Sequence, residues 1–216
     1  MKRSIFPLAL LLFGARLAVA NGTVQVVCED EKHQRVADAV AWLTRVDAPP
    51  AMASPPAEPV TIEQRGQEFA PYVTPILVGT KIAFPNRDSV QHQVYSLSKP
   101  KRFELPLYAG NARETVTFDQ PGVVTLGCNI HDWMVAYIVV LATPHFAASG
   151  ADGTASIGGL PAGRYQLEVW HPRLAGQVQR EIVIASGDPA PQIILLTLKP
   201  DRRIRRAPDA SGGAYR

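Results

Sequence analysis

The chain has 216 residues, of which 46% are hydrophobic and 19% charged, a composition that excludes a disordered protein and allows one large domain or two small ones. The formal net charge of +3 comes from the two ends, because the body from Asn21 to Leu198 has 13 bases against 17 acids. A nucleic-acid binder with a basic folded surface is largely excluded, since phosphate binding needs clustered cations on that surface.

Residues 1–20 have the pattern of a secretory signal peptide. Lys2 and Arg3 precede a mostly apolar run from Ile5 to Gly14, and the segment ends in an Ala-Val-Ala tripeptide of the kind that signal peptidase cleaves. The apolar run is shorter than the roughly twenty residues that a membrane span needs, and no later segment is long and apolar enough. We therefore expect an exported protein of the periplasm, without a transmembrane segment.

Residues 21–46 predict a β-hairpin, and residues 47–58 predict a linker. The hairpin is indicated by the apolar stretches Val24–Val27 and Val36–Leu43, with a polar turn between them. Five prolines between Asp47 and Pro59 are incompatible with a regular element and are typical of a linker.

Residues 59–143 predict a β-sandwich or barrel. Short β-branched runs broken by Gly, Pro and Asn recur along this region, which is the pattern of an all-β fold. We expect strands at Val60–Gln64, Val73–Val78, Thr80–Phe84, Gln93–Leu97, Thr115–Phe118, Val123–Leu126 and Val135–Leu141. Lys99–Arg113 is rich in Pro, Gly and charge, and we expect it to be a long crossover loop.

Residues 144–200 predict a second, smaller all-β unit. The expected strands are Arg164–Trp170, Val178–Ile184 and Gln192–Leu198, with turns at Ala151–Gly153 and Gly158–Gly163. Residues 201–216 are charged and rich in Gly, Ser and Ala, and we expect them to be a disordered basic tail.

A thiol, an imidazole and a thioether recur at three-residue spacing in Cys128, His131 and Met134, between two predicted strands. One Cys, two His and a distant Met are the donor set of a blue-copper electron-transfer site, so a second histidine is needed upstream. His92 begins a predicted strand and is the candidate. Three alternatives remain open: a tetrahedral zinc site, a disulfide between Cys28 and Cys128, and Met134 as ordinary core.

Two spaced motifs resemble the cupredoxins, the plastocyanin and amicyanin group of type 1 copper proteins. They are Phe84-x-Asn86-x-Asp88-x3-His92-x-Val94 and Gly122-x2-Thr125-x2-Cys128-x2-His131-x2-Met134, in that order. The resemblance implies a Greek-key β-sandwich over residues 59–143 and one mononuclear copper held by His92, Cys128 and His131, with Met134 as a weak axial ligand. The long crossover loop and the run Asn129-Ile-His-Asp-Trp-Met also resemble exported cupredoxin-like chains labelled methylamine utilization proteins. The residue after the first histidine is commonly Asn in this family, and here it is Gln93.

The second unit resembles the carboxypeptidase-regulatory-like, prealbumin-type β-sandwich. The resemblance is carried by Ala151-Asp-Gly and by Gly159-Leu-Pro-Ala-Gly-x-Tyr-x-Leu-x-Val. That family begins with a strand and hairpin, and the matching hairpin here is at 21–46, ahead of the cupredoxin-like region. We therefore expect one discontinuous sandwich with the copper domain inserted, and contacts between Trp42 and the strand around Leu167.

The sequence favours an electron carrier over an enzyme, because no substrate-activating residues stand out and one cupredoxin domain lacks the histidines for a second copper. A redox partner protein is implied, and the sequence does not identify it. Two other functions remain open: copper binding and delivery in the exported compartment, and an envelope interaction protein with a structural metal.

Overall fold

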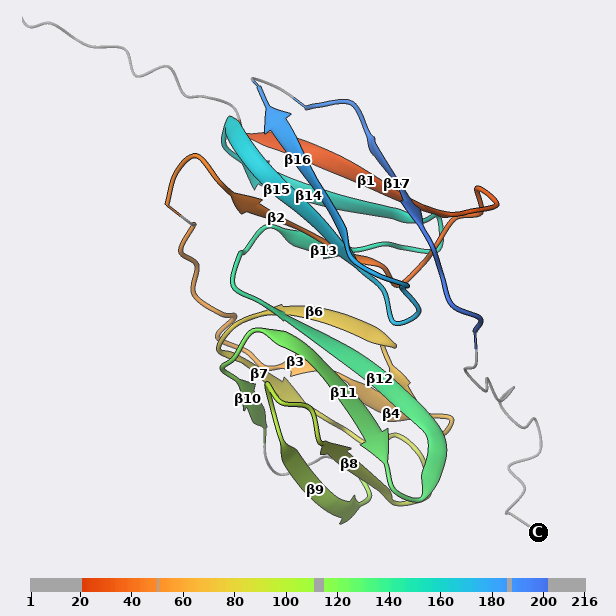
Figure 1. The fold of residues 1–216 in the computed structure, drawn as a ribbon. Coiled ribbons are helices and arrows are strands. Elements are labelled where there is room, and N and C mark those ends of the chain that lie inside the picture. The colour runs from red at the N-terminus through yellow and green to blue at the C-terminus, as the bar shows by residue number, and fades with distance from the viewer. Residues whose placement is uncertain (1–20, 50, 111–114, 186–187, 202–216) are drawn as a thin grey trace, which may run out of the picture.

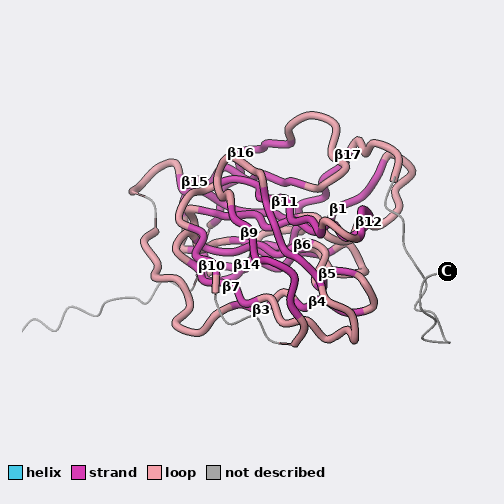
Figure 2. Tube along the Cα trace, turned by 90° about the horizontal axis from the view of Figure 1, so that it is seen from below, coloured by secondary structure: helices cyan, strands magenta, loops and turns pink. Residues whose placement is uncertain are grey.

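The computed structural model describes residues 21–49, 51–110, 115–185 and 188–201, and over these ranges it contains seventeen β-strands and no helix (Figure 2). The prediction of an all-β fold is confirmed. The predicted signal peptide and most of the predicted basic tail lie outside the described residues. The described part of the chain has no helix of the length and apolarity that a membrane span requires.

The strands form two stacked β-sandwiches (Figure 1). The first sandwich contains the strands from β3 to β12, and their bounds are β3 Val60–Thr61, β4 Glu63–Arg65, β5 Glu68–Ala70, β6 Val73–Leu77, β7 Thr80–Ala83, β8 His92–Ser96, β9 Phe103–Tyr108, β10 Val116–Phe118, β11 Gly122–Cys128 and β12 His131–Leu141. The second contains β1 Gly22–Asp30, β2 Val40–Arg45, β13 Phe146–Ala148, β14 Thr154–Leu160, β15 Gly163–Trp170, β16 Val178–Ile184 and β17 Gln192–Leu196.

The first sandwich has a five-stranded sheet in the order β6-β12-β11-β8-β9, a three-stranded sheet β10-β7-β3 and the hairpin β4-β5. Alternating side chains of these strands point inward, as a half-buried sheet requires. They form one apolar core whose largest fully buried members are Phe69, Phe84, Phe118 and Ile138. The core places the amino end of β8 and the turn between β11 and β12 at the same end of the sandwich (Figure 1).

The second sandwich is built from both ends of the described chain. β1 pairs antiparallel with β14 and parallel with β17, and β2 pairs antiparallel with β15. The register places Trp42 opposite Glu168, and the Trp42 indole N–H donates a hydrogen bond of 2.9 Å to the Glu168 carboxylate. The expected contact between Trp42 and the strand around Leu167 is therefore present.

A third apolar cluster joins the two sandwiches. Val73, Val139 and Leu141 from the first sandwich pack with Val40 from the second. The Thr143 hydroxyl also donates a buried hydrogen bond of 2.8 Å to the Leu43 carbonyl. Because the connection is both apolar and hydrogen-bonded, the sandwiches are in direct contact rather than linked only by the chain.

Part of the expected crossover loop Lys99–Arg113 is a strand, and this part of the sequence prediction was wrong. β9 occupies Phe103–Tyr108 and pairs with β8 at the edge of the five-stranded sheet. An edge strand tolerates Pro106, since a residue without an N–H removes no central ladder bond there. Phe103 and Leu105 face the core, whereas Glu104, the charged residue of the strand, lies on the outer face.

Two further differences lie in the second sandwich. β14 extends to Leu160, so that Gly158 and Gly159 are strand residues and the turn expected at Gly158–Gly163 is shorter. The region after Thr143 also contributes the short strand β13, which pairs with β2. Neither strand end shows in the sequence, because the glycines and alanines there carry no apolar alternation.

Candidate metal centre

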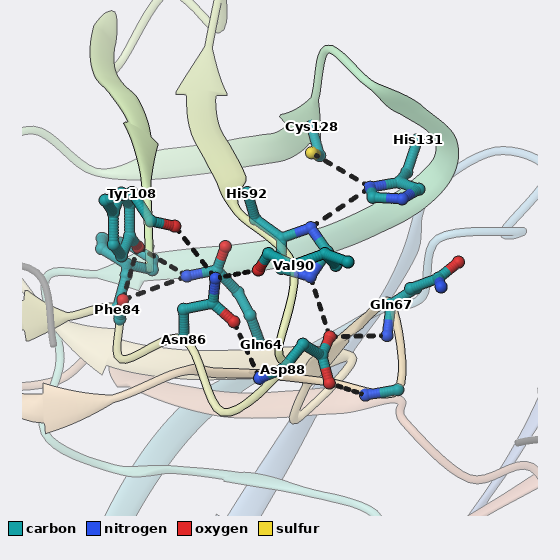
Figure 3. A network of polar contacts seen from close by, with 11 residues as sticks. Gln64, Gln67, Phe84, Asn86, Asp88, Val90, His92, Tyr108, Cys128 and His131 are labelled. Atoms are coloured by element: carbon teal, nitrogen blue, oxygen red, sulfur yellow. Dashed lines mark hydrogen bonds and ion pairs between the residues drawn. The ribbon is translucent and has the colours of Figure 1, made fainter. Parts of the chain in front are cut away.

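Three of the four predicted metal-binding side chains meet at one end of the first sandwich (Figure 3). The Nδ1 atoms of His92 and His131 are 3.2 Å apart, and the Cys128 Sγ lies 3.7 Å from the His131 Nδ1. One donor atom from each of these residues lies within 4.8 Å of the other two. The exposed fractions are 0% for His92, 3% for Cys128 and 6% for His131, so the cluster is closed to bulk water.

The turn between β11 and β12 brings Cys128 and His131 together. Cys128 is the last residue of β11 and His131 the first of β12, and the two are paired across the strands with only two residues between them. Gly127 leaves room for the Tyr95 ring of the neighbouring strand β8, because a Cβ at this position would lie 2.8 Å from that ring. His92 begins β8 and therefore lies beside this turn.

The sequence had indicated an inter-strand loop for all three residues of the motif. Met134 instead lies on β12 itself. It is 1% exposed and belongs to the same buried cluster as Cys128. The structure therefore places Met134 in the apolar core that also contains Cys128, and its ligand role stays a prediction.

The environment of Cys128 favours the thiolate. Burial alone raises the pKa of a thiol, but hydrogen bonds from His92 and from the backbone N–H groups of Gln93 and Ile130 outweigh burial and lower the pKa of Cys128 below its ordinary value. A thiolate is the form of cysteine that binds metals.

His92 is held from the opposite side by a carboxylate. The His92 Nε2 lies 2.8 Å from Oδ2 of Asp88, and the side chain of Asp88 is 14% exposed (Figure 3). Burial lowers the pKa of His92, but its contacts with Cys128 and Asp88 have the larger combined effect, so the pKa is raised above its ordinary value.

A buried polar network surrounds the loop before His92 (Figure 3). The Asn86 amide donates to the carbonyls of Val90 at 2.8 Å and Tyr108 at 3.0 Å, and its oxygen accepts the Asp88 N–H at 2.9 Å. The fully buried Gln64 side chain donates to the Phe84 carbonyl and to the Tyr108 hydroxyl. Burial raises the pKa of Tyr108 to about 12, so its hydroxyl is neutral.

Sequence reasoning missed two members of this network. Gln64 falls in a predicted strand and Tyr108 in the predicted crossover loop, and neither has a local signal of its role. Asn86 and Asp88 belong to the motif that begins at Phe84, but the motif does not show which groups they contact.

The amide of Gln93 does not join the ligand strands. Its Nε2 donates to Glu104 on the neighbouring edge strand, on the exposed face of the sheet. The connection to the thiol is made by the Gln93 backbone N–H instead. Asn129, the other amide near the thiol in the sequence, is exposed in the turn.

The remaining cysteine and histidines lie away from the cluster. Cys28 is a free buried thiol in the core of the second sandwich, and Cys128 is also free, so the disulfide alternative is wrong. His145 directly precedes β13 and His171 directly follows β15, both in the second sandwich. His33 is an exposed turn residue paired with Glu29. Over the described ranges, His92, Cys128 and His131 form the one group of three such donors.

No protein-family model matches the sequence, and no curated protein sequence matches it. Solved structures similar to this chain include a Cu-containing nitrite reductase (NirK) from Thermus scotoductus SA-01, at 31% identity and a TM-score of 0.37. The similarity covers 45% of this chain and 25% of the reductase, so the chain spans about a quarter of that protein's length.

A purple cupredoxin from Nitrosopumilus maritimus is similar at 26% identity and a TM-score of 0.35, over 38% of this chain and 99% of that one. A mutant of amicyanin in the Cu(I) form is similar at 18% identity and a TM-score of 0.35, over 38% of this chain and 82% of that one. The similar structures thus include a cupredoxin and an amicyanin, the groups that the sequence resemblance names. The prealbumin-type resemblance of the second sandwich stays a prediction.

Proposed function

We propose that this chain binds one copper ion of type 1, with His92, Cys128 and His131 as ligands and Met134 as a weak axial ligand. The observation that carries the proposal is the convergence of one thiol and two imidazole Nδ1 atoms in a closed site. A set of one thiolate, two imidazoles and a thioether suits copper in both oxidation states. It is a poor set for zinc, which favours additional thiolates or a carboxylate over a thioether.

The electrostatics of the site fit the metal. Copper requires a deprotonated sulfur, and the hydrogen bonds that lower the pKa of Cys128 supply one near neutral pH. The imidazole nitrogens that face the sulfur are the Nδ1 atoms, and the Nε2 of His92 is already occupied by a carboxylate. The residues present therefore fit a copper ion without rearrangement of the ring of His92.

We propose that the protein carries single electrons. Bound copper supplies a one-electron couple, and the chain supplies ligands fixed on three paired strands. Burial of all three ligands favours a carrier over a delivery protein, since delivery requires an incoming ligand to reach the metal. His131 is the ligand nearest to the surface, and it lies beside Ile130, which is 50% exposed. We propose this edge as the point where a redox partner protein approaches.

We also propose that the two sandwiches are separate domains. Residues 59–143 would be the copper domain, inserted into a domain made of residues 21–46 and 144–200, with residues 47–58 as a linker. The pairing of β1 with β14 and β17, and of β2 with β15, supports this division. Residues 1–20 would direct the protein to the periplasm, and comparing the cell fractions of chains with and without them tests this.

Addition of Cu(II) to the purified protein tests the proposed site. An intense visible charge-transfer band from the thiolate is expected, together with one copper per chain. The band disappears in Cys128→Ser and persists in Cys28→Ser, the matched control with a buried thiol in the other sandwich. A band that survives Cys128→Ser contradicts the proposal. Measured electron self-exchange then separates the two functions, because a carrier exchanges electrons rapidly and a delivery protein releases copper to a chelator instead.

A further inference from the structure

The Asp88 carboxylate is bound on both oxygens and has no arginine or lysine partner among the described residues. Its Oδ1 accepts the Gly66 N–H at 2.6 Å, and its Oδ2 accepts the Gln67 N–H at 2.8 Å. The same Oδ2 lies 2.8 Å from the His92 Nε2. A partly buried carboxylate that contacts two backbone amides and one imidazole is held in position by these three groups.

This arrangement decides which nitrogen of His92 carries hydrogen. A carboxylate only accepts hydrogen bonds, so the Nε2 atom facing Asp88 must be the N–H donor. In the singly protonated ring the lone pair is then on Nδ1, the atom that faces His131. The hydrogen bond from His92 to Cys128 belongs to the doubly protonated ring, which has hydrogen on both nitrogens. Asp88 therefore selects the tautomer of His92 that can bind a metal.

The turn of the β4–β5 hairpin supplies the two amides. Gly66 and Gln67 have φ angles of +63° and +58°, the left-handed values of a two-residue turn that closes a tight hairpin. Consecutive N–H groups in such turns point into one concavity that binds an anion. Here the anion is the Asp88 side chain, so the hairpin at residues 63–70 is clamped onto the loop that leads to His92 (Figure 3).

The hairpin is joined to the same loop at a second point. Gln64 and Asn86 form a parallel β-bridge, with the Gln64 N–H bonded to the Pro85 carbonyl at 2.9 Å and the Arg87 N–H bonded to the Gln64 carbonyl at 2.8 Å. The Arg87 guanidinium also contacts Glu63 at 3.2 Å. Movement of Asp88 away from His92 therefore requires the hairpin and the loop to separate.

We propose that Asp88 is a positioning residue of the metal centre, which holds His92 with hydrogen on Nε2 and Nδ1 free to bind, and that the β4–β5 hairpin holds Asp88 in turn. This inference rests on the proposed function for its metal, and on the distances above for its geometry. Partners that orient a metal-binding imidazole in this way typically change metal affinity by about 10- to 100-fold when removed.

The test compares Asp88→Asn with Asp30→Asn in the full chain. Asp30 is a matched control, since its Oδ1 also accepts two backbone N–H groups, those of Lys32 and Gln34, but in the second sandwich. We expect Cu(II) affinity, measured by competition with a chelator, to fall about 10- to 100-fold in Asp88→Asn and to stay within about 2-fold in Asp30→Asn. Equal affinities for the two variants overturn the proposal.

A second measurement needs no copper, and its deciding result comes from the parent chain. Nitrogen-15 NMR of the metal-free parent chain, at a pH above the titration of the His92 imidazole, reports which ring nitrogen carries hydrogen. We expect hydrogen on Nε2 in the parent chain, and a shift of the population toward Nδ1–H in Asp88→Asn, because the Cys128 thiolate then competes for that hydrogen. A parent chain with hydrogen on Nδ1 overturns the proposal, even where Asp88→Asn does not fold.

The two measurements also separate this proposal from the proposed function. A parent chain that gives no thiolate band with Cu(II) contradicts the copper function, whereas the tautomer of His92 still decides the role of Asp88. A parent chain that gives the band but has hydrogen on Nδ1 when metal-free contradicts the role of Asp88 alone.

Discussion

Each sandwich contains one buried cysteine, and the two thiols differ in chemistry although they barely differ in exposure. Cys28 is 0% exposed and Cys128 is 3% exposed. Burial raises the pKa of Cys28 to about 11, whereas the pKa of Cys128 is lowered. Cys28 lies within β1 among apolar neighbours, while Cys128 lies at a strand end where the His92 side chain and two backbone N–H groups donate to the sulfur. Donors at the strand end, rather than burial, therefore decide which thiol can bind a metal.

The buried histidines differ in the same way. Contacts with Cys128 and Asp88 raise the pKa of His92 in the first sandwich. In the second sandwich, burial and the neighbouring Arg173 lower the pKa of His171 to about 4 despite the opposing charge of Asp201. The Nδ1 of His171 accepts the Arg173 N–H at 3.2 Å, which requires an unprotonated nitrogen. The first sandwich thus favours the ionised forms of Cys128 and His92, whereas the second keeps Cys28 and His171 neutral.

The largest expected effect is on thiol reactivity in the metal-free protein. At pH 7 a thiol with a pKa of about 11 has roughly one thiolate in 10⁴, whereas a pKa below the ordinary value gives at least about 100-fold more. We expect a disulfide reagent to react with Cys128 at least about 10-fold faster than with Cys28, because the lower nucleophilicity of the less basic thiolate offsets part of the gain. Stopped-flow absorbance measures both rates, with Cys28→Ser and Cys128→Ser to assign the phases. Similar rates for the two thiols would contradict the inferred difference between their pKa values.

The next effect is on the pH dependence of stability. The unfolded chain protonates His171 near its ordinary pKa of 6.5, and the folded chain only near 4, so the free energy of unfolding falls as the pH drops from about 6.5 to about 4. The loss is at most about 3 kcal/mol. Urea unfolding of the metal-free protein at pH 7.5 and pH 4.5 measures it.

The control for this prediction is His171→Asn, which keeps an acceptor for the Arg173 N–H without an imidazole. Its stability should fall less over the same interval. A variant that loses as much stability as the parent chain would assign the pH dependence to other groups.

The smallest effect compares two glycines of the second sandwich. Gly153 has a φ of +73°, and a Cβ there would lie 2.8 Å from the Cys28 carbonyl oxygen. Gly159 has a φ of +72°, with open space around its Cβ position. In each alanine variant the left-handed backbone lowers the free energy of unfolding by about 1–2 kcal/mol. The backbone clash lowers it further in Gly153→Ala. Thermal unfolding measures the stability of both variants. A change of the copper band in either variant would contradict the assignment of copper binding to the first sandwich alone.

The cluster of His92, Cys128 and His131 was predictable because each of the three lies in a short local motif at a strand end. The spacing of Cys128 and His131 already implies a tight turn, and His92 is the histidine that begins a predicted strand. The strand expected at Arg164–Trp170 is found at Gly163–Trp170, since its polar and apolar side chains alternate regularly. Local pattern is sufficient where one strand or one turn decides the outcome.

The carboxylate contact of His92 was not predictable from local pattern. It depends on a hairpin at residues 63–70 meeting a loop some twenty residues later in the chain, and the register of that meeting is set by the packed core. Tyr108 was missed for a related reason. Its strand is at a sheet edge, where Pro106 is tolerated although proline normally indicates a loop.

The pairing of β1 with β14 and β17 has a consequence for synthesis of the chain. β1 leaves the ribosome first among the described strands, but its partners follow more than a hundred residues later, and the Thr23 N–H bonds to Asp188 at a separation of 165 residues. The strands of the first sandwich are all neighbours within about eighty residues. Because local contacts form before distant ones, we expect the first sandwich to assemble before β1 pairs with β14 and β17. The ligand cluster would then be in place before the strand that contains Cys28 is buried.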